Sequence, residues 1–301
     1  MIERHRRGPL VIASVAVVAG LVLAGLLLLA RMVGDSEEGS QYVMSGAASS
    51  TTNPAASTVA PSPSTVPTSL RPNSVVGIGT NPLTSPVSLR KQACVLPPWA
   101  EDDPTVRTFL DVAMGCLNST WQPVLARLSI PFTAPELKVS ASVASLGCGR
   151  PPEENSFYCD GTIYLAPSSY QGTNAGRDAI PTAAISMLAH EYGHHLQQLS
   201  GTLGAATEMI TLMGRETPAG LEISRRTELQ AQCLSGIFVG TNFDIASIQV
   251  AQRDNYTRGD APGRPADHGS PRNFGEWFTK GAGRTSLDTC NTWSAASETV
   301  G

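Results

Sequence analysis

The strongest constraint on the fold of this chain is the sequence His190-Glu191-Tyr192-Gly193-His194, which has the pattern H-E-x-x-H. Residues four apart lie on one face of a helix, with Cβ atoms about 5–6 Å apart, so both imidazoles can reach one metal ion. Glu191 then lies beside the metal, where a carboxylate can accept a proton from water. Three of the five histidines fall between positions 190 and 195, which argues against a chance pattern on a polar helix.

The residues around the motif favour the helix that it requires. Apolar side chains recur at three- and four-residue steps and form one stripe: Ile185, Leu188, Tyr192, Leu196 and Leu199. Pro181 and Thr182 suit the start of this helix, and Gly201 suits its end. We expect one side of the helix to pack on the core and the other to face a cleft. His195 points about 100° away from His194, so we expect it in the outer shell of the site or at the surface.

A catalytic zinc site usually has three protein ligands and one open position, so a third ligand is needed. One large class of zinc proteases extends the motif as H-E-x-x-H-x-x-G-x-x-H, but Gln197 and Ser200 stand where its glycine and third histidine would be. The alternative is a glutamate from a second helix, and four candidates follow: Glu208, Glu216, Glu222 and Glu228. Glu228 is the best choice, because residues 227–233 are good helix formers without a breaker.

Four segments in the same order resemble the bacterial putative neutral zinc metallopeptidase family. Residues 190–195 match its H-E-x-G-H-H element, and residues 227–233 (TELQAQC) resemble its E-L-Q-A-D-C element. Residues 157–165 resemble the family's segment in which F-Y-C is followed by I-Y-L. Residues 268–278 resemble its C-terminal segment, in which H-G-S is followed by an arginine and then by W-F. The resemblance extends over roughly residues 90–295.

This resemblance implies a zincin-like α+β domain in which the third zinc ligand is a glutamate. One Zn²⁺ per chain would be held by His190, His194 and Glu228, and Glu191 would be the general base of peptide hydrolysis. The same resemblance makes His268 the residue that stabilises the oxyanion of the tetrahedral intermediate. A surface histidine in a loop rich in glycine and proline is the alternative for that position.

Two neighbours of this expected site have supporting roles. Asp267 precedes His268 and would hold its ring through a carboxylate. Gln232 stands where the family usually has an acid that accepts the far N–H of a ligand histidine, a contact worth about 10–100-fold in metal affinity or activity. Gln232 accepts a hydrogen bond through its amide oxygen but supplies no negative charge. We therefore expect a competent but weakened site, and a catalytically inactive, zinc-stabilised binding module at the cell surface is the alternative.

Short strands precede the two zinc helices, which suggests an α+β domain. Residues 105–128 have apolar positions at helical spacing, and residues 137–143 alternate like a strand. Residues 162–165 also form an expected strand, for which two placements remain open. At the edge of the sheet it would bind an extended peptide through its backbone, whereas in the interior it would not.

An uncharged apolar run of 21 residues, from position 10 to position 30, precedes the domain. At about 1.5 Å per residue such a run spans a bilayer core of about 30 Å. Arg4, Arg6 and Arg7 favour a cytoplasmic N-terminus, here residues 1–9, with the rest of the chain exported. We therefore expect a single-pass transmembrane anchor at residues 10–31. A cleaved signal peptide is the rival, although its apolar core is usually only about 7–15 residues long.

Residues 32–88 are rich in Ser, Thr, Pro and Ala and hold few bulky apolar residues, which predicts a disordered linker. Residues 89–301 are long enough for one domain with a sizeable core. The chain has a net charge of −4 and no basic patch, so nucleic-acid binding is not supported.

All six cysteines lie in the expected domain, and an even number in an exported domain suggests disulfides. The sequence does not fix their connectivity. Pairing neighbours along the chain gives the expected bonds: Cys94–Cys116, Cys148–Cys159 and Cys233–Cys290. The last would tie the helix of Glu228 to the C-terminal segment. A cysteine zinc site is disfavoured, because the chain has no C-x-x-C pair.

Taken together, these features predict a membrane-anchored, extracytoplasmic, zinc-dependent endopeptidase that acts on peptides or proteins through metal-activated water, with Glu191 as the base. A disulfide-built interaction domain without metal is a third interpretation, and it predicts that chelation changes nothing. The sequence leaves the substrate and the oligomeric state open.

Overall fold

The computed structural model describes residues 75–139, 155–171 and 176–301, which all belong to one unit of the chain, Ser64–Gly301. The expected anchor at residues 10–31 and Cys148 lie outside the described residues. Within the described ranges, no helix combines the length and the apolar character that crossing a bilayer requires.

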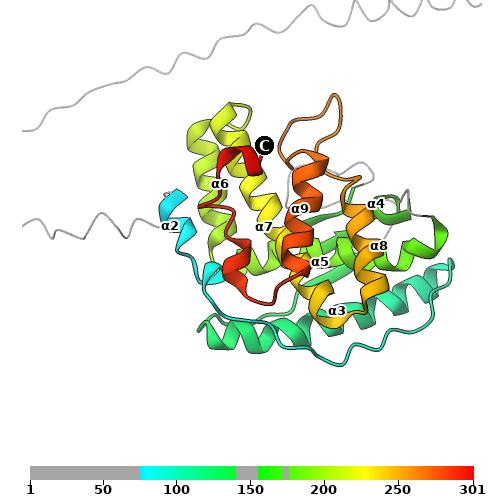
Figure 1. Ribbon diagram of the computed structural model, residues 1–301. Helices are drawn as coiled ribbons and strands as arrows, with labels where there is room; N and C mark the ends of the chain where they lie inside the picture. The colour runs from blue at the N-terminus through cyan, green and yellow to red at the C-terminus, as the bar shows by residue number, and fades with distance from the viewer. Residues whose placement is uncertain (1–74, 140–154, 172–175) are drawn as a thin grey trace, which may run out of the picture. The chain divides into compact units, whose positions relative to one another are not determined.

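Helices make up most of the described residues, with a small sheet among them (Figure 1). The longer helices are α3 (Asp103–Arg127), α5 (Ile180–Leu199), α6 (Thr202–Met213), α7 (Pro218–Asn242), α8 (Ile245–Asn255) and α9 (Pro271–Ala282). The short ones are α2 (Val75–Gly79), α4 (Ser168–Gln171) and the 3₁₀ turns η2 (Pro82–Thr84), η3 (Arg177–Ala179), η4 (Leu287–Cys290) and η5 (Ser297–Thr299). This mixed, helix-rich architecture agrees with the α+β class expected from the sequence.

The sheet has three strands in the order β1 (Glu136–Val139), β3 (Thr162–Leu165), β2 (Phe157–Cys159). β1 is parallel to β3, and β2 is antiparallel to it. Asp160 and Gly161 join β2 to β3 with φ of 41° and 82°, the two positive values that a tight hairpin turn needs. Among the described strands β3 is therefore central, so the edge placement considered for residues 162–165 is wrong.

α5, the helix with the H-E-x-x-H motif, is the central helix of the described unit. Pro181 lies in its first turn, and Gly201, in the left-handed region at φ 79°, follows its end. The helix contacts α3, α4, α6, α7, α8 and two of the strands. The expectation that one whole side faces a cleft is wrong, because neighbours surround this helix and bury residues 183–186 and 188–197.

α7 lies between α5 and α9 and approaches both closely; α7 and α9 run side by side in Figure 1. A Cβ atom on Gly193 of α5 would lie 2.8 Å from the Cα of Ala231 on α7. On the other side of α7, a Cβ on Gly240 would lie 2.1 Å from the carbonyl oxygen of Ala282 on α9. Real Cβ contacts are longer than both distances, so glycine at these two positions sets how closely the helices pack.

The segment from Val75 to Ser88 packs onto the folded unit. Ile78 and Leu83 are buried, at 2% and 0% exposure, and Leu287 N–H donates to the carbonyl of Val87 at 3.0 Å. This part of the predicted linker is thus folded, because its few apolar side chains enter cores formed by other elements. The overall composition of residues 32–88 is polar, so these few apolar side chains do not change the prediction that it gives.

Two disulfides join elements of the unit. Cys94–Cys116 ties the segment before α3 to α3, and Cys233–Cys290 ties α7 to η4. Both are pairs that neighbour order along the chain predicts. Cys159 is also disulfide-bonded, and its expected partner Cys148 lies outside the described residues.

Candidate metal centre

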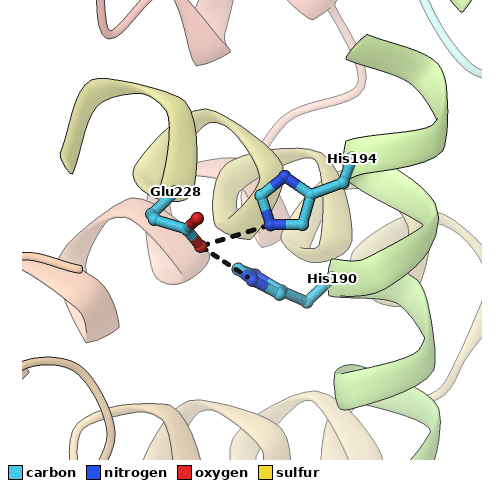
Figure 2. A group of neighbouring side chains, drawn as sticks. All are labelled: His190, His194 and Glu228. Atoms are coloured by element: carbon cyan, nitrogen blue, oxygen red, sulfur yellow. Dashed lines mark hydrogen bonds and ion pairs between the residues drawn. The ribbon is translucent and has the colours of Figure 1, made fainter. Parts of the chain in front are cut away.

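His190, His194 and Glu228 converge at the crossing of α5 and α7 (Figure 2). The two histidines lie one turn apart on α5, and Glu228 reaches them from α7. Oε2 of Glu228 lies 3.3 Å from Nε2 of His190 and 3.2 Å from Nε2 of His194. The structure thus brings together the three residues that the sequence nominates as metal ligands.

The separations between these atoms fit a small tetrahedral cation. Zn–N and Zn–O bonds of about 2.0–2.1 Å at tetrahedral angles place neighbouring ligand atoms about 3.3–3.4 Å apart. Both measured N···O distances lie close to that value. Two imidazole nitrogens and one carboxylate oxygen are also a donor set that zinc favours at catalytic sites. The chemistry of the three residues and these two separations therefore fit a zinc ion.

The far nitrogen of His190 is held by Gln232 on α7. Nδ1 of His190 lies 2.9 Å from Oε1 of Gln232, and both side chains are buried. Since a neutral amide oxygen only accepts, Nδ1 carries a proton, and Nε2 is the ring nitrogen that remains for a metal. The structure thus places Gln232 on a candidate ligand histidine, as the sequence predicts.

The far nitrogen of His194 is held by Gln197, whose role the sequence interpretation missed. Nδ1 of His194 lies 2.9 Å from Oε1 of Gln197, and Nε2 of Gln197 donates to the carbonyl of Thr227 at 2.9 Å. Because that carbonyl accepts only, the amide oxygen must face His194. The available signal was spacing, since Gln197 lies three residues after His194 on one helix face.

Glu228 is partly buried and carries charge. Burial raises the pKa of this carboxyl, but the charges of His194 and His268 and the hydrogen bonds from both site histidines outweigh it. The net result is a pKa well below the ordinary value. An ionised carboxylate is therefore ready for a cation at neutral pH.

Glu191 lies between the two histidines in sequence and is 4% exposed. Burial raises its pKa, an effect that the charge of Glu228 reinforces and the neighbouring histidines His190, His194 and His268 partly offset. A carboxyl whose pKa lies above the ordinary value is a better proton acceptor than an exposed glutamate.

His268, on the loop before α9, is near the same carboxylate. Its Nε2 lies 3.7 Å from Oε2 of Glu228, and its Nδ1 lies 2.6 Å from Oδ1 of Asp267. Its backbone N–H donates to Asp260, a contact that no sequence signal indicated. Burial lowers the pKa of His268, but Glu228, Asp267 and Asp260 raise it to about 9. Its side chain is 49% exposed, so it borders the site from the solvent side.

His195 does not belong to the metal centre. It is buried at 2% exposure, with Nδ1 3.1 Å from the hydroxyl of Tyr158 and Nε2 2.7 Å from the carbonyl of Thr133. Both expected placements, an outer-shell position and the surface, are wrong. The ring points away from His194 and joins α5 to β2 and the segment before β1.

The sequence model of a protein family described as "Putative neutral zinc metallopeptidase" matches residues 70–293. The matched range begins before α2 and ends after η4, so it includes every residue of the metal centre.

Individual relatives are similar to 62% of the chain. The uncharacterised protein Rv2575 of Mycobacterium tuberculosis is 30% identical over 216 residues, which cover 62% of this chain and 70% of that protein. The uncharacterised protein YpfJ of Escherichia coli K12 is 27% identical over 206 residues, with the same two coverages. No solved structure matches this chain.

Proposed function

The chain belongs to the putative neutral zinc metallopeptidase family, and we propose on that premise that it is a zinc-dependent endopeptidase. The observation that supports the proposal most is the placement of Nε2 of both His190 and His194 within 3.3 Å of Oε2 of Glu228, next to the buried Glu191. This donor set, with a carboxylate base beside it, suits the hydrolysis of peptide bonds by water.

His190, His194 and Glu228 would hold the ion, with Glu228 as the third ligand in a zincin-like arrangement. Zinc bound there supplies Lewis acidity and lowers the pKa of a coordinated water toward neutrality. Gln232 and Gln197 hold each histidine at Nδ1, so both Nε2 atoms face Oε2 of Glu228, where the ion would bind.

Glu191 acts as the general base in this proposal. Its raised pKa lets it take a proton from the attacking water and then deliver that proton to the leaving amine. Its burial keeps bulk water from competing for that proton.

His268 stabilises the oxyanion of the tetrahedral intermediate. In the metal-free chain Glu228, Asp267 and Asp260 raise its pKa to about 9, and a ring protonated at neutral pH makes Nε2–H a charged donor. Asp267 fixes the ring through Nδ1, which leaves Nε2 facing the site.

The test is cleavage of a mixed peptide library by the full-length chain, with and without a chelator, beside Glu191→Gln. We expect wild-type cleavage that chelation stops, and a Glu191→Gln variant that binds one zinc per chain but does not cleave. Glu216→Gln, an exposed carboxylate in the turn before α7, is the matched control and should cleave normally. Cleavage by Glu191→Gln would refute the mechanism.

A non-catalytic zinc module is the second candidate, and the neutral Gln232 beside His190 is the observation that favours it. A side chain without charge at this position makes the histidine a weaker metal ligand. This alternative predicts one zinc per folded chain, with no cleavage of any library peptide by the wild type.

The proposal includes a single-pass membrane anchor at residues 10–31, with the folded unit outside the cytoplasm. Its support is the uncharged apolar run after three arginines. Alkaline washing of isolated membranes tests it, because a spanning segment stays in the membrane pellet. Release of the chain into the wash would favour a cleaved signal peptide or a peripheral attachment.

A further inference from the structure

The side chain of Gln232 has two chemically different ends, and only one of them suits a metal-binding His190. If Oε1 faces the ring, Nδ1 carries the proton and Nε2 offers its lone pair to a metal. If the amide were rotated by half a turn, its N–H would face Nδ1 and drive the proton to Nε2, which then could not bind metal. A carboxylate has two equivalent oxygens and poses no such choice.

Asn255, the last residue of α8, contacts the other end of that amide. Nε2 of Gln232 donates to Oδ1 of Asn255, and Nδ2 of Asn255 donates to Oγ of Ser186 at 2.9 Å and to the carbonyl of Ala251 at 2.8 Å. Asn255, Gln232 and Ser186 are each at most 2% exposed. Bulk solvent therefore hardly reaches these contacts.

The carbonyl of Ala251 gives this chain of bonds its direction. A backbone carbonyl accepts only, so the atom of Asn255 that faces it must be the amide nitrogen. Oδ1 of Asn255 then faces Gln232, which places the nitrogen of Gln232 on that side and its oxygen toward His190. The carbonyl of Ala251 on α8 thus determines, through Asn255 and Gln232, that an accepting oxygen faces Nδ1 of His190.

We propose that Asn255 is a positioning residue for the metal centre, which fixes the amide of Gln232 so that its oxygen faces His190. The hydrogen bonds run from Ser186 on α5 through Asn255 on α8 and Gln232 on α7 to His190. Ser186 lies one turn before His190, so this series of bonds begins and ends on α5. The inference rests on the proposed function only in requiring that the site binds zinc.

The test is the zinc affinity of the full-length chain, measured by competition with a chromophoric chelator, in Asn255→Ser and Asn255→Asp. Serine can still bond the carbonyl four residues before it but does not reach Gln232. We expect about tenfold weaker zinc binding in this variant. Aspartate keeps an oxygen facing Gln232 and, as the neutral acid that this buried position favours, still donates to the carbonyl of Ala251, so its affinity should stay within about twofold of wild type.

Asn242→Ser is the matched control, because Asn242 makes similar buried contacts away from the site. Its Nδ2 donates to the carbonyl of Phe238, four residues earlier, and its Oδ1 accepts from Gln92 N–H. This variant should lose stability in thermal unfolding but keep the wild-type zinc affinity. The absorption spectrum of the cobalt-loaded chain gives a second readout, since a changed ligand set at His190 alters it.

A double-mutant cycle separates positioning from a general effect on folding. In a Gln232→Glu background either carboxylate oxygen can accept from Nδ1 of His190. Adding Asn255→Ser should therefore change zinc affinity by about twofold or less. An undiminished tenfold loss in that background, or equal losses in Asn255→Ser and Asn255→Asp, would overturn the inference. Unchanged affinity in Asn255→Ser would overturn it too while leaving the proposed function intact, whereas a wild type without zinc would refute both.

Discussion

Neutral amides, not carboxylates, hold both histidines of the metal centre. Gln232 accepts from His190 and Gln197 accepts from His194. Each amide is oriented in turn by other groups, Asn255 for the first and the carbonyl of Thr227 for the second. The ring geometry of an acid-held site is therefore kept without its added negative charge, so the donors are well aligned but less electron-rich.

Replacing Gln197 by leucine should weaken zinc binding about 10–100-fold, because His194 loses the group that keeps its proton on Nδ1. Chelator competition measures the change. Gln198→Leu is the matched control on the same helix, since Gln198 is exposed, and its affinity should not change. Equal affinities in the two variants would mean that packing alone orients His194.

Zinc affinity should also rise with pH. Burial lowers the pKa of His194, but the charges of Glu228 and Glu191 and the hydrogen bonds that the ring donates to Glu228 and Gln197 raise it to about 9 in the metal-free chain. Zinc must displace that proton, so affinity should increase by about tenfold per pH unit up to about pH 9 and then level off. Titration calorimetry in buffers of different ionisation enthalpy counts the released proton. No release at neutral pH would show that His194 is already neutral.

At the residue scale, the sequence identifies the three candidate metal ligands and two of the residues that hold the site histidines, Gln232 and Asp267. Spacing on one helix makes His190 and His194 obvious, and helix propensity together with family resemblance selects Glu228. Asn255 and Asp260 approach the site only through tertiary folding, on α8 and on the loop after it, and no local pattern marks them. Gln197 had a usable signal in its three-residue spacing from His194.

At the element scale, the crossing of α5 and α7 determines whether Glu228 reaches the histidines. Gly193 is the contact point, because any side chain there meets the backbone of Ala231. α7 is pinned beyond that crossing by the Cys233–Cys290 disulfide and by its packing on α9. The helices therefore have little room to separate and accept a larger residue.

Gly193→Ala should destabilise the fold by about 1–3 kcal/mol, the typical cost of overpacking. It should also weaken zinc binding, since moving α7 away withdraws Glu228. Thermal unfolding and chelator competition measure the two effects. Gly204→Ala on α6 is the control, because its added Cβ meets nothing within 4 Å, and it should gain up to about 1 kcal/mol from helix propensity. A neutral Gly193→Ala would show that the crossing is not tight.

The longer helices are well predicted by apolar periodicity, and the ends of α5 lie within two residues of their sequence signals. The sheet is harder, because its strands are only three or four residues long. Their order depends on the parallel pairing of β1 with β3, which joins residues far apart in the chain. The burial of Ile78 and Leu83 was missed because a composition-based boundary does not register single apolar residues that insert into a core built elsewhere.

On the scale of the whole molecule, a metal at this centre would link α5 to α7 across the middle of the fold. Removing it should lower the melting temperature, since an ion that binds only the folded state stabilises it by about 2.7 kcal/mol at one hundred times its Kd. For a domain of this size that corresponds to roughly 5–10 °C. Calorimetry with and without a chelator measures the shift, and His194→Ala should show none. A chelator effect of equal size in His194→Ala would place the metal elsewhere.

The order of these elements along the chain has a consequence for synthesis. Glu228 follows His194 by 34 positions, with the whole of α6 between them, and Cys290 follows its partner Cys233 by 57. A chain whose synthesis has reached only the end of α6 has His190 and His194 but not Glu228. Tight metal capture, and the hydrolytic chemistry proposed here, therefore begin only after α7 has been made and has docked. A product that stops before α7 would be inert.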